Sequence, residues 1–425
     1  MPIRLSLAAA LLALVCAPPA RAQGQAAHLT VYDAGLAEFL EERTVELQPG
    51  INQLEWRSLM PKAVVRTLRV TAEEAEVVRQ DVTYDGAQVG GQRTPVLRLV
   101  LRNRGPAGPR RVQVDYLAPD LSWRADYSLA LDPTAEAVPP TAAALDAWVS
   151  LYNQTGADVR AGAVDLVAGE IALLPVQGVV LRDEDDAAAN VYQQTRSEMA
   201  DGSAGADAAG AAPLSAFTRF TLGRDLSLNS NAPVSRHPLF QRARLAVVQR
   251  NVFENEYGAQ TFARGGFVLL PRGLEVRLVS KNPTEASMPA GQVTIYARQG
   301  PVAQIVGQDR VPLTPPGGEF SVTQGRSSTL FGARRVLERR QVEYRSQEGN
   351  TRYRLITSVE VTLSNRGTRA AEAFVREGVE QFADNQWTVT TSSAPHERLG
   401  ANSLQFKVQV PAGGQSVVTY TVETK

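Results

Sequence analysis

The sequence is poor in the residues that form covalent cross-links or bind metals. Of its 425 residues, one is a cysteine, Cys16, and three are histidines. A single cysteine excludes an internal disulfide, so a disulfide-stapled scaffold is ruled out. Basic and acidic residues balance at 44 each. No global positive field is therefore available to attract nucleic acid or an anionic membrane surface, and we predict no nucleic-acid partner.

Long apolar runs are also missing, apart from one at the N-terminus that has the layout of a secretory signal peptide. Arg4 is followed by an apolar stretch over residues 5–16, a proline pair and a small-residue site that ends at Ala22. This run is shorter than the roughly 20 residues that a membrane-spanning helix needs, so we predict no transmembrane segment. We expect residues 1–22 to be cleaved near Ala22 and the mature chain to be periplasmic or secreted in a bacterium.

Such cleavage would leave the mature chain without cysteine. Disulfides and thiol catalysis would then both be impossible. A lipoprotein signal would instead make Cys16 the N-terminal residue, although Val15 stands where that processing requires a small side chain. An exported chain of this length without disulfides is typical of a bacterial envelope, where a large hydrophobic core makes them unnecessary.

Helical periodicity is nearly absent, whereas polar and apolar residues alternate over much of the chain. Clear examples are residues 110–118, 291–299 and 403–410. Alternation with a period of two is typical of strands with one buried face. The sequence therefore predicts an all-β protein built from tandem antiparallel β-sandwich domains of the immunoglobulin-like kind.

Turn residues and composition divide the chain into parts. We predict an N-terminal β domain over 27–119, a central β domain over 120–329, and a C-terminal hairpin and sandwich over 330–425. Residues 183–216 consist mainly of alanine, glycine, aspartate and serine, and we expect a disordered insertion because they bury too little apolar surface. The strand that follows, in 217–228, is able to pair back with the strands before it, which would make the central domain discontinuous.

Four asparagines close four strands of similar pattern: Asn103, Asn153, Asn282 and Asn365. Asparagine ends strands well because its side chain bonds the backbone two residues further on and tolerates a positive φ. We interpret each one as the start of a hairpin, with the returning strand following within about a dozen residues. This assigns turn chemistry to the four asparagines and no catalytic role.

The longest predicted hairpin begins near residue 330 and turns near residues 348–350. Its first strand carries the densest basic stretch of the chain, comprising Arg334, Arg335, Arg339, Arg340 and Arg345, interleaved with Glu338 and Glu343. Mixed signs along a strand are typical of an exposed face. The functional alternative is that these arginines bind an envelope polymer that carries phosphate or carboxylate groups, through bidentate contacts.

Trp123 is a further candidate binding residue. In the stretch SWRADY, alternation places Trp123, Ala125 and Tyr127 on one face of a strand and Arg124 with Asp126 on the other. One interpretation is a buried aromatic anchor with an ion pair outside. The other is an aromatic platform for a sugar ring.

Catalytic motifs are missing. No Gly-x-Ser-x-Gly elbow and no Ser-x-x-Lys occurs in a plausible strand-turn-helix context. The histidines, His28, His237 and His396, are interpreted as separate loop residues, so we predict no metal site, no cofactor and no catalytic residue from motifs. Two carboxylates brought together by the fold could still cleave a glycoside, and their spacing in the sequence would not reveal them.

Four segments together resemble the bacterial mucoidy-inhibitor-like family. They are residues 116–131, 149–170, 287–327 and 386–422, and the resemblance extends over nearly the whole mature chain. It implies an exported protein built around a β-rich domain of unknown function, and it brings no catalytic residues. The chain departs from many relatives in having no long coiled coil, and in having Asp158-Val159 where they have a tryptophan after the acidic residue.

We therefore expect an exported, non-enzymatic β-sandwich protein that binds a partner protein or an envelope polymer, or that has a structural role in the cell envelope. Sandwiches commonly bind partners through strand edges and hairpin loops. The alternative is an envelope glycan hydrolase that uses two carboxylates.

Overall fold

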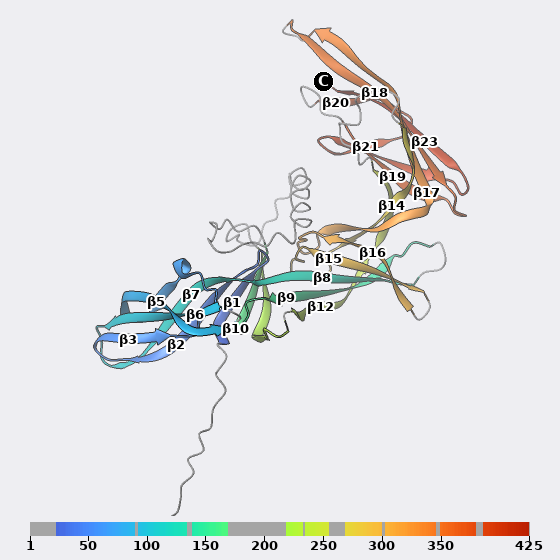
Figure 1. Cartoon of the computed structure of the whole chain (residues 1–425). Coiled ribbons are helices and arrows are strands. Elements are labelled where there is room, and N and C mark those ends of the chain that lie inside the picture. Colours follow the sequence, from blue (N-terminus) through green and yellow to red (C-terminus); the bar gives the residue numbers. More distant parts are fainter. Residues whose placement is uncertain are drawn as a thin grey trace, which may run out of the picture. The chain divides into compact units, whose positions relative to one another are not determined.

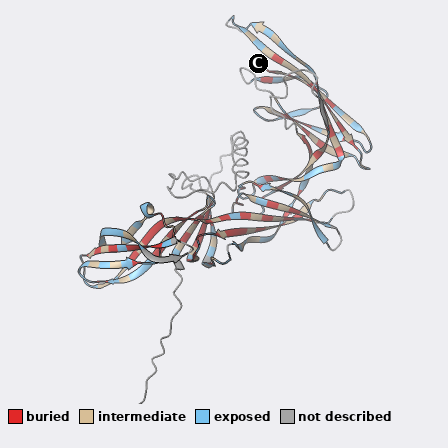
Figure 2. Cartoon of the chain, in the orientation of Figure 1, coloured by how far each residue is buried: buried red, intermediate tan, exposed pale blue. Residues whose placement is uncertain are grey.

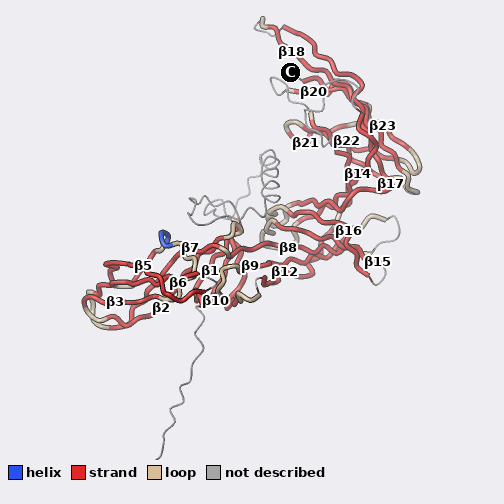
Figure 3. Tube along the Cα trace, in the orientation of Figure 1, coloured by secondary structure: helices blue, strands red, loops and turns tan. Residues whose placement is uncertain are grey.

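The computed structural model describes residues 23–89, 92–133, 138–168, 218–232, 234–254, 268–299, 302–345, 349–379 and 386–424. These residues form 23 strands in four sheets and one short 3-10 helix, η1 (Val65–Thr67) (Figures 1 and 3). The predicted all-β class is confirmed. Among the described residues, no helix is long and apolar enough to cross a membrane. The expected signal peptide and the expected insertion over 183–216 lie outside the described residues.

Internal contacts divide the described residues into two compact units. The first unit contains residues 23–124, 150–168 and 218–237, and the second contains 125–149 and 238–424. The division falls within strands, so three strands contribute residues to both units. The three-part division predicted from the sequence stays a prediction.

The first unit is built on a mixed six-stranded sheet. Its order is β11 (Thr218–Leu228), β10 (Asp158–Ala168), β1 (Gln23–Tyr32), β2 (Leu36–Leu47), β7 (Gly108–Pro119) and β4 (Arg69–Ala72). β1 and β10 are parallel, and the other neighbours are antiparallel. β10 pairs with β11, which confirms the prediction that the strand in 217–228 pairs back with the strands before it.

A second, three-stranded sheet of the same unit packs on this one. Its order is β3 (Gly50–Trp56), β6 (Gln92–Asn103) and β5 (Ala75–Val89). Trp56 of β3 is fully buried and bonds the buried Glu41 of β2, so the two sheets meet face to face as in a sandwich.

A five-stranded sheet has the order β12 (Val234–Ala246), β9 (Ala142–Asn153), β8 (Leu121–Leu131), β15 (Gly291–Gln299) and β16 (Val302–Val311). β8 and β15 are parallel. The buried side chains of β8 include Trp123, Ala125 and Tyr127, and Arg124 is exposed, as the alternation predicted.

The second unit also contains a nine-stranded sheet. Its order is β20 (Trp387–Ser392), β23 (Gln415–Thr424), β18 (Thr351–Asn365), β17 (Glu319–Arg345), β14 (Val268–Lys281), β13 (Val248–Glu254), β19 (Ala371–Gly378), β22 (Ser403–Val410) and β21 (His396–Gly400). β17 and β18 pair antiparallel up to Arg345 and Thr351, which confirms the long predicted hairpin. β13 and β19 are parallel.

The nine-stranded sheet folds over a single hydrophobic core. Side chains from both ends of the sheet meet there, and the rings of Phe406 on β22 and Tyr420 on β23 lie 5.2 Å apart. Figure 2 shows buried and exposed residues alternating along these strands. One continuous sheet therefore supplies both faces of a sandwich-like core.

The four predicted asparagines are all buried and hold four corners of the fold. In each, the side-chain oxygen accepts a hydrogen bond from the backbone N–H two residues on, at 2.8–3.2 Å, as predicted. The side-chain amide nitrogen donates to a backbone carbonyl across the turn and to a second carbonyl on a more distant segment. The second acceptor is Leu228 for Asn153 and Val410 for Asn365.

The prediction that these corners are hairpins is wrong. β6 and β7 lie in different sheets, as do β9 and β10, and β14 and β15. β18 and β19 share the nine-stranded sheet but are not neighbours in it. Each corner joins two strands that are not hydrogen-bonded neighbours. The second hydrogen bond of the asparagine amide nitrogen attaches the corner to a segment that is distant in the sequence.

Candidate functional site

The arginines of β17 do not form one cluster. A bulge between Val336 and Glu338 inserts one extra residue into β17 opposite β18. This changes which residues share a face, because side chains alternate along a strand. Arg334 points into the core, whereas Arg335 lies opposite Glu360 on the outer face.

Two of the sequence-predicted arginines form surface ion pairs. Arg335 donates to Glu360 at 2.8 Å, and Arg340 lies 3.1 Å from Glu338. Arg339 is partly buried opposite Thr357. The guanidinium groups of Arg335 and Arg340 are thus paired with glutamates of the same chain. The hypothesis drawn from the sequence had assigned these arginines to an anionic polymer.

Arg334 forms a buried ion pair with Glu377 of β19. The Arg334 Nε lies 2.9 and 3.1 Å from the two carboxylate oxygens, and the two side chains are 4% and 0% exposed. Burial raises the pKa of Glu377, and the charge and hydrogen bonds of Arg334 oppose that rise. Burial by itself would lower the pKa of Arg334, but Glu377 raises it, so the guanidinium stays charged.

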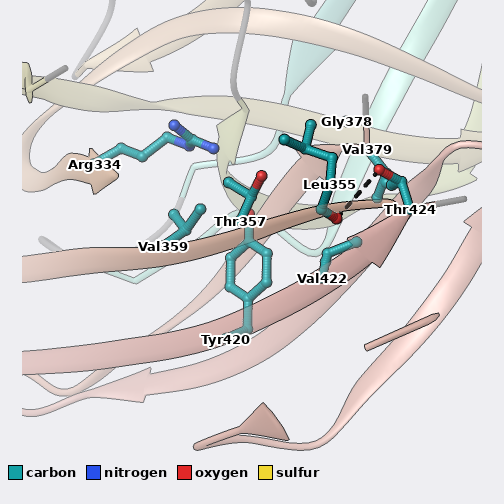
Figure 4. Close-up of a pocket in the computed structure, with 9 residues that line it drawn as sticks. All are labelled: Arg334, Leu355, Thr357, Val359, Gly378, Val379, Tyr420, Val422 and Thr424. Atoms are coloured by element: carbon teal, nitrogen blue, oxygen red, sulfur yellow. Dashed lines mark hydrogen bonds between the residues drawn. The ribbon is translucent and has the colours of Figure 1, made fainter. Parts of the chain in front are cut away.

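A small cavity adjoins this pair (Figure 4). Its volume is about 20 Å³, and its lining includes Arg334, Thr357, Gly378 and Tyr420. That volume holds about one water molecule. Tyr420 is also hydrogen-bonded to the pair, and burial followed by the Glu377 charge raises its pKa well above the usual range. The cavity is too small for a substrate, so we interpret the cluster as structural.

A shallow hollow of about 400 Å³ lies on the outer side of the same strands. Its polar lining consists of serine and threonine hydroxyls from β18, β20, β23 and the residue after β20: Ser358, Thr391, Ser392, Ser393, Thr419 and Thr421. Ser358 and Thr421 bond each other at 2.9 Å. No carboxylate lines this hollow, so it lacks the acid and base that glycoside hydrolysis requires.

Trp123 is a buried anchor. Its side chain is 2% exposed, its Nε1 donates to the Val167 carbonyl at 3.2 Å, and its ring meets Phe220 edge to face at 5.9 Å. A ring enclosed in this way offers no surface on which a sugar could stack.

The three histidines lie in strands, which corrects the expectation that they occupy loops. His28 is in β1 and lies 3.1 Å from Asp165, His237 is in β12 beside Ser235, and His396 is in β21. Among the described residues, no group of three or more histidine, cysteine or acidic side chains could hold a metal ion.

Glu41 of β2 is a second buried carboxylate, and no motif in the sequence pointed to it. It accepts hydrogen bonds from Trp56 Nε1 at 2.6 Å, from the Tyr116 hydroxyl at 2.7 Å and from Ser58. Burial raises its pKa, and these bonds, followed by the charge of Arg43, oppose the rise. Its burial could have been suspected only from the alternation along β2, which places Glu41 on the same face as the buried Ala37 and Phe39.

Neither buried glutamate resembles half of a catalytic carboxylate pair. The charged side chains that shift the pKa of Glu41 and Glu377 are arginines: Arg43 for the first, and Arg334 with Arg272 for the second. The two glutamates belong to different compact units. These surroundings favour ionic and hydrogen-bonded anchoring over acid-base chemistry.

The edge strand β16 exposes its apolar side chains. In its first half, Val302–Val306, no residue is charged, and Val302 and Ile305 are 55% and 61% exposed. Natural sheet edges are usually protected by charges, prolines or covering segments. β12, the opposite edge of this sheet, carries three arginines and a proline: Arg236, Arg242, Arg244 and Pro238.

Within the part of the chain that the structure describes, only the second half of β16 is covered. Gly307 approaches the backbone of Gln324 on β17 so closely that an added Cβ would collide with it. Asp309 accepts a hydrogen bond from the Thr323 N–H of the same strand. The first half of β16 is therefore an exposed, uncharged strand edge.

No protein-family model matches the chain, and no curated protein is significantly similar to it.

Proposed function

We propose that the chain is an exported, non-enzymatic β-sandwich protein, of the mucoidy-inhibitor-like kind, that binds a partner protein in the bacterial cell envelope. The observation that carries this proposal is the unprotected first half of β16, with Val302 and Ile305 exposed. The apolar N-terminal run supports export. The four segments that resemble the mucoidy-inhibitor-like family support the envelope setting.

Strand addition is the binding mode that fits this edge. An extended segment of the partner would pair with the backbone groups of β16 that face away from β15. Val302 and Ile305 are three residues apart and lie on opposite faces of β16, so they would give apolar contacts to side chains on both faces of that segment. Because β17 covers the second half of β16, the added strand would extend only along residues 302–306.

Replacement of Ile305 with lysine tests this function. A charge on the edge should disfavour strand addition, as it does on natural protected edges. The immobilised full chain should recover a partner from envelope extract at physiological salt, and Ile305→Lys should lose it. The matched control is Val417→Lys, because Val417 is 51% exposed on β23, a strand with neighbours on both sides.

Hydrogen exchange then locates the contact. In the complex, amides of residues 302–306 should become protected, while the outward face of β23 should not change. Recovery of no partner, equal loss with both lysine variants, or protection elsewhere would each contradict the proposal.

A further inference from the structure

Three arginines gather on the outer face of the nine-stranded sheet, away from the stretch that the sequence emphasised. Arg250 of β13 is directly opposite Arg277 of β14, and on the other side of β13 Glu254 is opposite Arg376 of β19. The ring of Phe374, two residues before Arg376 and on the same face, lies 5.7 Å beneath the Arg250 guanidinium. The three cations therefore project from adjacent strands.

The nearby carboxylates do not balance these cations. Arg277 donates to Glu275 at 2.6 Å and also pairs with Glu254, while Glu372, on the same face of β19, pairs with Lys407. Among the described residues, no carboxylate lies within ion-pair distance of Arg250 or Arg376. Burial, followed by the charge of Arg277, lowers the pKa of Arg376, and the charges of Glu254 and Glu275 oppose this only in part.

Arg376 is held in place by its neighbours. Its Nε donates to Gln405 Oε1 at 2.9 Å, while Gln405 Nε2 donates to Glu397 Oε1 at 2.6 Å. Because a carboxylate only accepts, Glu397 fixes the amide so that its oxygen faces Arg376. Gln405 is 7% exposed, so this support is rigid, and it leaves the terminal nitrogens of Arg376 available.

We propose that Arg250 and Arg376 on the adjacent strands β13 and β19, with Arg277 on β14 at the other side of β13, form a binding site for an anionic group with several oxygen acceptors, a carboxylate or a phosphate. Guanidinium forks match both geometries, and two arginines that lack a carboxylate partner supply the charge that such a group would neutralise. This site is separate from the β16 edge and goes beyond the proposed protein binding. An envelope polymer that carries uronate or phosphate groups would present the required chemistry.

Inorganic phosphate and galacturonate, titrated separately into the full chain by calorimetry at low salt, test the site. We expect at least one of them to bind, and Arg250→Gln and Arg376→Gln each to weaken that binding about tenfold by removing charge-assisted hydrogen bonds. The ligand that binds more tightly distinguishes a phosphate-bearing from a uronate-bearing source. Circular dichroism checks that each variant is folded.

Arg335→Gln and Arg340→Gln are the matched controls, because these arginines are exposed and already paired with Glu360 and Glu338. They should change the affinity less than about twofold. The proposal is overturned if neither anion binds, or if the controls weaken binding as much as Arg250→Gln. Failure of strand addition at Ile305 would leave this result unaffected, so the two proposals fail separately.

Discussion

Glu41 and Glu377 show two ways of burying a carboxylate in the same chain. Glu41 is surrounded by neutral donors, namely an indole, a phenol and a hydroxyl, and its nearest cation, Arg43, is exposed. Glu377 faces a buried guanidinium, Arg334. The first arrangement leaves little charge behind if the carboxylate is lost, whereas the second leaves a buried cation or anion uncompensated. The two sites should therefore respond differently to the same kind of substitution.

Arg334→Ala should have the largest effect. It leaves Glu377 buried without its cation, and we expect it to lower the free energy of unfolding by about 3–5 kcal/mol. Urea denaturation of the full chain measures this. Arg335→Ala, which breaks an exposed pair on the neighbouring residue, should cost less than about 1 kcal/mol. Equal losses for the two variants would show that the Arg334 pair contributes no more than a surface one.

Glu41→Ala should cost less than Arg334→Ala. It leaves the indole of Trp56 and the hydroxyl of Tyr116 without their acceptor, a loss of about 3 kcal/mol in the free energy of unfolding. Ser58 is only partly buried, so water can replace its bond. The same urea experiment applies, and a loss greater than that of Arg334→Ala would reverse the proposed contrast.

Glu41 should also make stability depend on pH. Its folded-state pKa is raised above 4.5, so the folded chain holds this proton more tightly than the unfolded chain does. Its contribution is therefore fully present below pH 4.5 and is lost as the pH rises through the folded-state pKa. Glu41→Gln should flatten this part of the curve of unfolding free energy against pH. An unchanged curve would mean that the Glu41 pKa is not raised.

The double substitution Arg334→Met with Glu377→Leu should have the smallest effect. Removing both charges leaves no uncompensated charge in the core, although the Tyr420 hydroxyl loses these two partners, and similar exchanges elsewhere range from neutral to stabilising. We expect the free energy of unfolding to stay within about 1 kcal/mol of the starting value or to increase. A loss as large as that of Arg334→Ala would indicate that packing around the pair, rather than its charge, determines stability.

Alternation along single strands was predictable from the sequence, but the partners of those strands were not. The buried face of β8, the β17–β18 hairpin and the return of β11 to β10 all follow from local pattern or from adjacency. The Asn103 corner could not be assigned correctly, because period-two alternation does not indicate which sheet the next strand joins. Its Asx-turn bond was predictable, since that bond involves only neighbouring residues.

How far each candidate site could be predicted depended on the same difference between pattern along one strand and pairing between strands. Arg334 and Arg335 face opposite sides of β17 by ordinary alternation, but the bulge between Val336 and Glu338 placed Arg340 on the outer face with Arg335, which charge spacing could not anticipate. Arg250 and Arg376 come to lie on adjacent strands only because β13 and β19 pair in parallel, which no sequence motif signals. The β16 edge could be noticed only as an uncharged stretch, because its position at the end of a sheet depends on the complete topology.

The buried asparagine corners also constrain the order in which a chain made from its N-terminus can complete its structure. Asn103 finds its distant acceptor, Leu47, among residues already synthesised. Asn153 must wait for Leu228, 75 residues later, and Asn365 for Val410, 45 residues later. Until those strands arrive, each of these two amides has a hydrogen-bond donor without its final acceptor. Contacts so distant in sequence form slowly, so these two corners should be among the last parts of a newly synthesised chain to exclude water.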